Sequence, residues 1–397
     1  MSRRLAALAA VTLLVVLAAI WAVIARQQAT QADLGGSLMF PSLQAAQQDI
    51  ARIEIGTGTK KITINRLGTG WSVAERAGYP ADANRVQTLL IALADLVMME
   101  PRTSLPERYA EIGVEDPGPD AKSVSVTVSD ASGKALAAVI IGRSQTMLAG
   151  ATGLNTYVRK PGEAQSWLGK GGFTLDHDPA QWLDKDLLVL VRERVMATMV
   201  VSANGNTLSI SRAKPTDETF QIANIPAGRE ARTPTIAAPL ANALGFLAAE
   251  DVRRADTLDF STSPVTSIWR TFDGLVITVT TIEQEGKVWA RLDAAVDMAQ
   301  VEAAKALEKS PAPDGTNLIK DATAVASEAE ALGAAWNGWA FALEGTKAKD
   351  LRTQMDDLLA PASNVAPALQ PGMPMPMPMP TPSGVVPGGP ASMLPQP

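Results

Sequence analysis

Residues 52–73, RIEIGTGTKKITINRLGTGWSV, carry the pattern that decides the fold class of this chain. Apolar and polar residues alternate over 52–55 and 61–65, as they do in β-strands that bury one face. Pairs of glycines separate the segments and are typical of tight turns. The stretch is therefore predicted to form two antiparallel strands and a third that starts at Trp71.

A helix is predicted directly after these strands. Asp82 is a residue type that caps helices, and apolar residues recur after it every three or four positions. They are Val86, Leu89, Leu90, Leu93, Leu96 and Val97. More strands are predicted at 123–128, 137–141 and 156–158, which gives an antiparallel sheet with one helix packed on a face.

The same order of elements recurs about 140 residues later, a spacing that indicates a duplicated domain rather than a short-period solenoid. A hairpin is predicted over 198–211 around an Asn-Gly turn, and Phe220 takes the place of Trp71. Thr233 and Pro234 open a second predicted helical segment. That segment contains Leu240, Leu244 and Leu247, and it is followed by predicted strands at 266–272, 275–282 and 288–292.

The fold class is thus predicted to be α+β, with two tandem units that each combine an antiparallel sheet and a helix. The predicted segments are a membrane anchor (1–26), a stalk (27–48), the first unit (49–188), the second unit (189–295), C-terminal helices with one strand (296–360) and a disordered Pro/Met-rich tail (361–397). Within the fifth segment we expect the strand at 338–343 and a final helix over 347–359. The composition of the tail favours an extended chain without a core.

The anchor is predicted from an uncharged apolar run between Leu5 and Ala25. At about 1.5 Å per residue this run forms a helix of about 31 Å, which matches a hydrocarbon core of about 30 Å. Arg3 and Arg4 precede the run, so the positive-inside bias places the N-terminus in the cytoplasm and the bulk of the chain outside. The run is longer than the apolar part of a signal peptide, so we expect an uncleaved single-pass anchor, and cleavage after Ala25 is the alternative.

Composition excludes several kinds of chemistry. The chain has no cysteine, and therefore no disulfide, no thiolate nucleophile and no lipidated cysteine. The net charge of −6 argues against nucleic acid as a partner. His177 is the only histidine, and we interpret the LDHDP sequence around it as a turn that caps a helix before Ala180. No metal or cofactor is predicted.

No catalytic residues are predicted either. Ser211 and Lys214 match the S-x-x-K spacing of serine acyltransferases, but Ser211 ends a predicted strand and Lys214 precedes Pro215. Asp and Glu total 41, so a carboxylate pair for hydrolysis stays open as an alternative.

Tryptophans provide the remaining candidates. Trp71, Trp269 and Trp289 lie in predicted strands, and we expect them in the core. Trp336 and Trp339 lie close together near the end of the folded region. They are either core residues or a patch that faces a partner.

Several motifs of the exported part resemble the domain of unknown function 4340 family of bacterial membrane-anchored proteins. They are FP at 40–41, IEI at 53–55, GWSV at 70–73, GYPAD at 78–82, EP at 100–101, YAEIGVEDP at 109–117, IG at 141–142 and YVR at 157–159. The resemblance covers residues 40 to about 345 and is weaker in the second unit, where Phe220 stands in place of Trp71.

This resemblance implies an accessory role beside gliding-motility-type ABC transporters, at the periplasmic face of a bacterial inner membrane. It implies no activity and transfers no catalytic residues. Our first hypothesis is a non-enzymatic periplasmic accessory or scaffold protein, with an ABC-transporter permease or an auxiliary membrane protein as partner. The alternatives are a lipid- or glycan-binding ectodomain and an envelope hydrolase that uses carboxylates.

Overall fold

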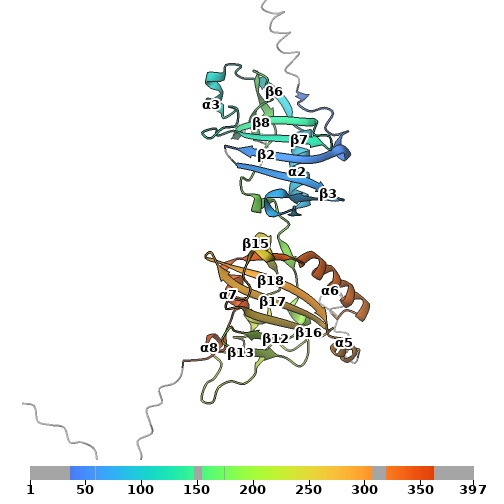
Figure 1. The fold of residues 1–397 in the computed structure, drawn as a ribbon, viewed down its shortest axis with the longest axis vertical. Coiled ribbons are helices and arrows are strands. Elements are labelled where there is room, and N and C mark those ends of the chain that lie inside the picture. Colours follow the sequence, from blue (N-terminus) through green and yellow to red (C-terminus); the bar gives the residue numbers. More distant parts are fainter. Residues whose placement is uncertain (1–35, 59, 147–153, 174, 306–318, 362–397) are drawn as a thin grey trace, which may run out of the picture.

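The computed structural model describes residues 36–58, 60–146, 154–173, 175–305 and 319–361 (Figure 1). It is an α+β structure with two antiparallel sheets and few helices. The predicted anchor run, Leu5–Ala25, and all of the predicted tail except Pro361 lie outside the described residues. Among the helices that are described, none combines the length and the apolar character needed to cross a membrane.

The first sheet, together with its helices, forms what we call the first unit. Its strands are β1 (Ser37–Leu38), β2 (Ile50–Thr57), β3 (Lys60–Leu67), β4 (Gly70–Val73), β5 (Tyr79–Pro80), β6 (Val97–Pro101), β7 (Val124–Asp130), β8 (Ala135–Thr146), β9 (Leu154–Arg159) and β10 (Ser166–Lys170). They are ordered β1-β6-β10-β9-β8-β7-β2-β3-β4-β5, so the first and fifth strands lie at opposite edges. Helices α2 (Ala83–Ala94) and α3 (Tyr109–Ile112) complete the unit.

The second unit repeats this plan. Its strands are β11 (Asp186–Leu188), β12 (Val195–Val201), β13 (Thr207–Ser211), β14 (Gln221–Ile222), β15 (Leu247–Arg254), β16 (Val265–Thr271), β17 (Leu275–Gln284), β18 (Lys287–Val296) and β19 (Trp339–Leu343), ordered β11-β15-β19-β18-β17-β16-β12-β13-β14. Its helices are α4 (Ala238–Ala241), α5 (Met298–Ala304), α6 (Ala322–Trp336), α7 (Gly345–Leu351) and α8 (Met355–Leu358). Helices α5 and α6 lie in the connection between β18 and β19, where the first unit has only residues 160–165 between β9 and β10.

The two sheets correspond in the register of their central strands, although β8 has bulges against β7 and β9 that β17 lacks. Equivalent strands pair in the same register, and both β2 and β12 carry a bulge near their first residue where they meet β7 and β16. Matched positions are Ile64 and Ile210, Ile53 and Thr198, Val128 and Trp269, Val139 and Val279, Val158 and Ala290, Trp167 and Phe341, Leu168 and Ala342, and Glu100 and Asp251. A one-residue slip would turn every core side chain to solvent, so this shared register reflects the shared apolar pattern.

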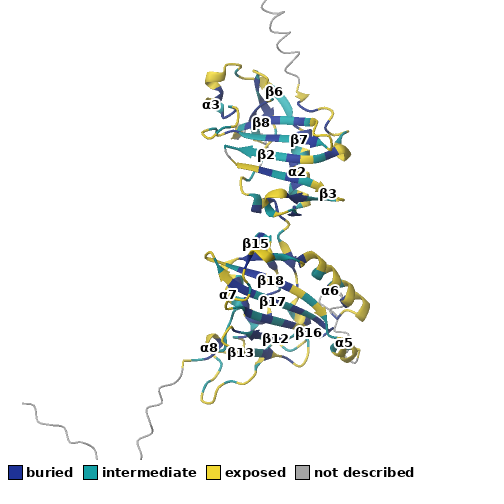
Figure 2. Ribbon diagram, viewed as in Figure 1, coloured by how far each residue is buried: buried dark blue, intermediate teal, exposed yellow. Residues whose placement is uncertain are grey.

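Burial follows the alternation seen in the sequence. In both units the central strands are buried along one face, whereas α6 leaves its outer side exposed (Figure 2). Trp269 and Trp289 are fully buried, as expected, and Trp71 is half-buried. Asp82 caps α2 by accepting hydrogen bonds from the backbone of Asn84 and Arg85, as the sequence predicts.

Helix prediction is wrong in the second unit. The segment predicted from Thr233 through Leu247 contains only the four-residue α4, and Leu247 begins β15. Pro234 and Pro239 remove backbone donors, and Gly245 has a weak helical preference, so a long helix is disfavoured there. The final helix predicted over 347–359 is divided into α7 and α8.

The sheets also draw on residues outside the segments predicted for them. Strand β1 lies in the predicted stalk, β11 in the predicted first unit and β19 in the predicted C-terminal segment. Each lies beside a strand that is distant in sequence, β6 for β1 and β15 for both β11 and β19. Sequence alternation identifies a strand but not the edge on which it pairs.

The register match generates a stability prediction. Thr198 occupies the position of Ile53, is 1% exposed, and its hydroxyl has no hydrogen-bond partner among the described residues. Replacing Thr198 with Val is expected to raise the free energy of unfolding by about 1–2 kcal/mol, because the unpaired hydroxyl is removed at nearly constant volume. The reciprocal change Ile53→Thr is the matched comparison and should destabilise. Chemical denaturation of both variants checks this, and a loss of stability in Thr198→Val would contradict it.

Candidate functional site at the junction of the two units

The first unit reaches the second through residues 73–80, which we call the donor turn. A short 3-10 helix, Ala74–Arg76, follows β4, and Ala77 and Gly78 both have positive φ angles (54° and 78°). This geometry reverses the chain so that Tyr79 pairs with Val73. As a result the Tyr79 side chain projects from the end of the first unit.

The segment that links the units seals this edge of the first sheet. Leu183 forms a β-bridge with Ala81, the Asp82 amide donates to the Trp182 carbonyl (2.9 Å), and the Asp184 amide donates to the Pro80 carbonyl (3.0 Å). Trp182 itself is fully buried. The link is therefore a hydrogen-bonded part of the first sheet and not a free tether.

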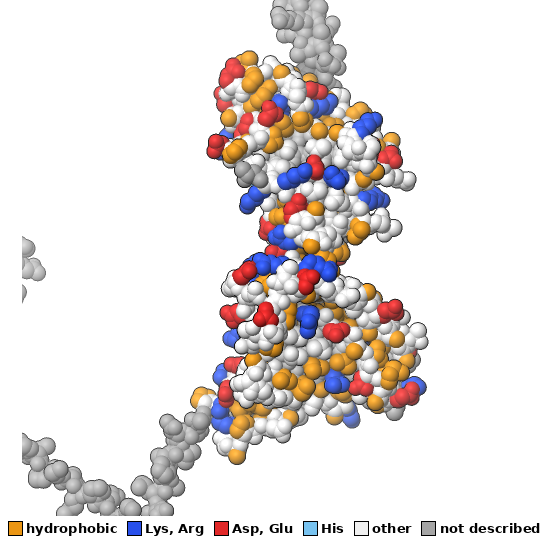
Figure 3. All heavy atoms as spheres, viewed as in Figure 1, with side chains coloured by type: hydrophobic (Ala, Val, Ile, Leu, Met, Phe, Trp, Pro, Cys, Tyr) orange, Lys and Arg blue, Asp and Glu red, His pale blue; other side chains and the backbone are white. Residues whose placement is uncertain are grey.

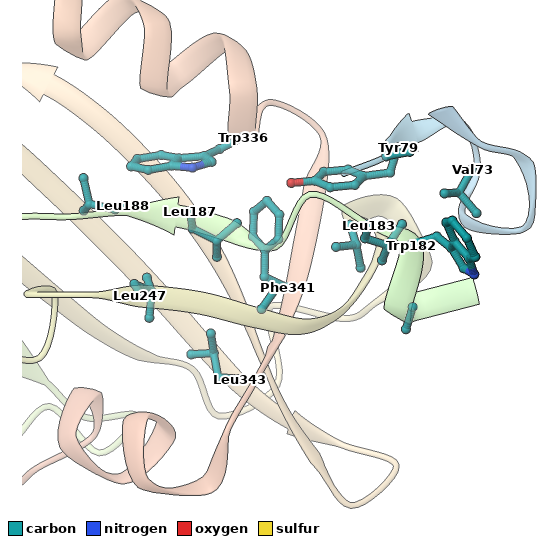
Figure 4. Close-up of a cluster of buried hydrophobic side chains, with 14 of the residues drawn as sticks. Val73, Tyr79, Trp182, Leu183, Leu187, Leu188, Leu247, Trp336, Phe341 and Leu343 are labelled. Atoms are coloured by element: carbon teal, nitrogen blue, oxygen red, sulfur yellow. The ribbon is translucent and has the colours of Figure 1, made fainter. Parts of the chain in front are cut away.

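Tyr79 enters the end of the second unit, among residues of β11, β15 and β19 (Figure 4). Its ring meets Trp339 edge-on, with 4.9 Å between centroids and 84° between planes, and Phe341 at 6.1 Å. Only 6% of Tyr79 is exposed. Edge-to-face contacts of this kind add about 0.5–1.5 kcal/mol to the burial term.

An ion pair closes the junction beside this aromatic cluster. The Arg76 guanidinium binds Asp251 of β15 with two hydrogen bonds, from Nε at 2.6 Å and from Nη2 at 3.2 Å. Asp178, in the linking segment, lies 3.8 Å from the same guanidinium. Charged side chains of both signs gather around the narrow waist of the molecule (Figure 3). A bidentate pair fixes orientation as well as distance.

The structure brings both predicted tryptophans to this junction. Trp339 is half-buried, contacts Tyr79 and lies under the guanidinium of Arg254 (4.7 Å). Trp336 is 2% exposed and packs in the core shared by the two units. Trp339 therefore contacts the first unit of its own chain, whereas Trp336 is a core residue that presents almost no surface to any other molecule.

Helix α6 carries Trp336, and a buried ionic cluster fixes that helix. Arg194, which precedes β12, pairs with Asp273 (2.9 Å) and with Glu328 of α6 (2.8 Å). Lys320 also binds Glu328 at 3.0 Å. The helix lies against β18, which pairs with β19 only over Val288–Ala290. The cluster thus holds a helix over an otherwise uncovered strand edge.

The protonation states of Tyr79 and Glu328 follow from these surroundings. Burial, with a smaller contribution from Asp184, raises the pKa of Tyr79, so the phenol at the junction is neutral. For Glu328, burial raises the pKa, but hydrogen bonds and charge from Arg194 and Lys320 outweigh it and the net shift is downward. The carboxylate is therefore charged and committed to holding α6.

The other sequence candidates lie apart from the junction chemistry. His177 is exposed in a turn, and Asp178 caps the short helix Pro179–Trp182 as expected. Ser211 ends β13, with no helical turn to bring Lys214 towards it. Over the part of the chain that the structure describes, no three His, Asp or Glu side chains form a group that could hold a metal.

Shallow grooves mark the surface. One, of about 540 Å³, lies between β18 and the end of α6, where Asp293 and Glu330 are both exposed. A second groove of about 360 Å³ is lined by Trp71 and the face of α2. Neither groove buries a carboxylate in the way a general acid requires.

Local sequence does not mark Arg76, Asp251 or Trp182 as junction residues. Arg76 and Asp251 are ordinary surface residue types in sequence, and only the fold brings them together across 175 positions. A weak signal existed at Tyr79, because an aromatic residue after a glycine turn has no place in a solvated loop. Trp336 and Trp339 are the residues of this region that the sequence analysis identifies as candidates.

Comparison with known proteins gives one result. The family model described as Domain of unknown function (DUF4340) matches residues 71–263. The match begins within β4 of the first unit and ends before β16, so it includes the donor turn, the linking segment and Asp251. Neither the curated proteins nor the solved structures include a match to the chain.

Tyr79 provides the first test of the junction. Tyr79→Ala is expected to cost about 3–5 kcal/mol and to split one unfolding transition into two, because each unit keeps its own core. Calorimetry of the region that contains both units measures both effects. Tyr79→Phe is the matched control, since the hydroxyl makes no hydrogen bond to a described residue, and it should unfold as the parent does. Equal behaviour of the two variants would contradict this role.

Glu328 provides a test that depends on pH. Its lowered pKa means that its contribution is complete above the unfolded value, about 4.3, and is lost as pH falls through the lower folded value. Glu328→Gln should cost about 1.5–3 kcal/mol at pH 7 and should lose less stability than the parent between about pH 5 and 3. Denaturation across this range, with exposed Glu330→Gln as control, measures the difference. Parallel curves for Glu328→Gln and the parent would exclude this coupling.

Proposed function

Because the chain belongs, through residues 71–263, to the DUF4340 family, we propose that it is a non-enzymatic accessory protein of an ABC-type transport system. It is held in a bacterial inner membrane by its N-terminal segment, with the two units in the periplasm. In this proposal it works as a scaffold that a permease or an auxiliary membrane protein contacts.

The junction is the observation that carries this proposal. A backbone bridge, a buried Tyr79 and a bidentate ion pair join the units into one elongated body (Figure 1). The chain enters the first sheet at β1, at the edge opposite β5, and ten strands about 4.8 Å apart separate these edges by about 40 Å. Such a body holds its second unit at a fixed distance from the point of entry, which is what a scaffold requires.

The ionic groups support a structural role. Asp273 and Glu328, the carboxylates buried with Arg194, are both engaged by cations and hydrogen bonds and leave no reactive oxygen towards a groove. Both cores are filled with large side chains, among them Trp182, Trp269 and Trp289. Filled cores favour a scaffold over a carrier that must enclose a lipid tail.

Removal of the anchor tests the proposal. A version that lacks residues 1–26, exported with a cleavable signal, should melt within a few degrees of the parent because both cores are intact, yet it should fail to complement a deletion strain. An unrelated single-pass anchor fused to residue 27 is the control and should restore function. Affinity purification of the anchored protein from membranes should recover an ABC permease. Full complementation by the unanchored version would overturn the proposal.

A further inference from the structure

The first unit carries an open groove between the turn that joins β3 to β4, the face of α2 and the short helix Gln47–Asp49. We call it the Trp71 groove, and its volume is about 360 Å³. Leu90 and Ile91 give it apolar surface, and no carboxylate lines it. The lining residues whose side chains can donate hydrogen bonds are Gln47, Gln48, Arg66, Thr69, Trp71 and Gln87. The groove therefore combines an aromatic ring with many hydrogen-bond donors and no negative charge.

These side chains are available to a ligand. Within the part of the chain that the structure describes, none of the six makes a side-chain hydrogen bond to another residue. The Arg66 guanidinium lies over the Trp71 ring, 5.3 Å from its centroid. Arg66 and the three glutamines are exposed, and Trp71 is half-buried. A ligand therefore reaches the groove without breaking an internal hydrogen bond of the described residues.

The second unit contains the same stacked pair of a cation and a ring. The register of β13 and β14, continued by one residue beyond each strand, places Arg212 at the position of Arg66 and Phe220 at that of Trp71. The Arg212 guanidinium lies 4.8 Å from the Phe220 ring centroid. Arg212 is 6% exposed and Phe220 is 4% exposed. The pair is thus covered in the second unit and open in the first.

Backbone carbonyls cover the pair in the second unit. Arg212 donates to the carbonyl oxygens of Pro215 (3.0 Å) and Asp217 (2.9 Å), which lie in the loop between β13 and β14. From the matched isoleucine of one strand to its partner on the next, the chain takes twelve positions in the second unit and nine in the first. The shorter turn of the first unit does not bring such carbonyls to Arg66, so the equivalent position stays open.

We propose that the Trp71 groove binds the Pro/Met-rich tail of its own chain, through residues 371–382 in an extended form. The prolyl rings pack on Trp71 and Ile91. The tail's carbonyl oxygens accept hydrogen bonds from Arg66 and the neighbouring glutamines, as the carbonyls of the β13–β14 loop do in the second unit. This inference goes beyond the proposed function and does not depend on it.

The sequence of the tail complements a groove rich in donors. Residues 371–382 read PGMPMPMPMPTP, so proline at alternate positions removes every second backbone donor and leaves every carbonyl acceptor. Each residue before a proline is biased towards extended or polyproline II backbone, and aromatic-lined grooves bind Pro-rich segments in that form. Residues 362–397 contain no charged side chain, so the tail has no cation that the carboxylate-free groove would leave unpaired.

The tail is long enough to reach the groove. The described chain ends at Pro361, beside the edge of the second sheet that Leu359 closes. Strands about 4.8 Å apart place this edge about 40 Å from β11, which lies at the junction with the first unit. The nineteen residues from Pro361 to Pro380 span about 59 Å as polyproline II, at about 3.1 Å each. Attachment to the same chain also raises the effective concentration of the tail, which favours it over a separate Pro-rich peptide.

Photocrosslinking of the full-length protein tests the proposal. A benzophenone-bearing phenylalanine replaces Ile91, which is 46% exposed, and the same residue in place of Met298 on α5 is the positional control. We expect Ile91 to crosslink to residues 371–382 and Met298 to give no such product, as identified by mass spectrometry. The protein is an equal mixture of isotopically heavy and light chains, because docking within one chain gives no mixed heavy–light product.

Loss of the guanidinium makes the test specific. Arg66→Ala should lower the Ile91 crosslink about tenfold, because hydrogen bonds from a charged donor are lost. Lys60→Ala, an exposed cation at the other end of β3, is the matched control and should leave the yield unchanged. Equal melting temperatures of the two variants show that both fold.

Proline replacement tests the tail without altering either core. Pro374→Ala, Pro376→Ala and Pro378→Ala combined should lower the crosslink at least about threefold, because the unbound tail becomes less restricted. Pro387→Ala, Pro390→Ala and Pro395→Ala combined, outside the Met-Pro run, should have no effect. Absence of the Ile91 crosslink, a mixed heavy–light product, or a yield that ignores Arg66→Ala would overturn the proposal.

Discussion

Burial of Tyr79 at the junction is the constraint on which the arrangement of this protein depends. The ring fills a site built from Trp339 and Phe341, and the backbone bridge between Ala81 and Leu183 holds it there. Without this contact the two sheets are separate domains on a short link, and inter-domain motion is the ordinary expectation. With it, the direction in which the chain enters the first unit determines where the second unit lies.

Local sequence pattern predicted the parts of the fold that local interactions decide. Alternation over 52–65 gives β2 and β3, and Asp82 starts α2, because each depends on neighbours in sequence. The duplication could be predicted for the same reason. The pairing of β11 and β19 with β15 could not be predicted from local sequence, because it joins residues up to about 90 positions apart and depends on which strand edges are free. The helix expected after Thr233 failed because apolar spacing alone does not weigh the two prolines.

For a similar reason, only part of the candidate site could be predicted from the sequence. Trp336 and Trp339 attract notice by residue type, but their burial depends on the first unit and on α6. Arg194 and Glu328 are 134 residues apart, and nothing in either local sequence marks a buried pair. Such a pair is costly to desolvate, so it persists where a precise position is needed, and here it positions the helix that ends at Trp336.

Both units close one sheet edge with a β-bridge to a later segment of the chain, but they differ in the residue that lies beyond that edge. After β5 the linking segment closes the sheet edge through Leu183, and after β14 the C-terminal segment closes the equivalent edge through Leu359. The flanking hydrogen bonds match as well, since Arg232 and Ala360 repeat the bonds of Asp82 and Asp184. What differs is the residue that extends beyond the closed edge, Tyr79 in the first unit and Arg229 in the second. A polar end stops a repeat array, whereas an apolar end continues it. The second unit therefore ends the array, because Arg229 stands where Tyr79 extends the first unit into its neighbour.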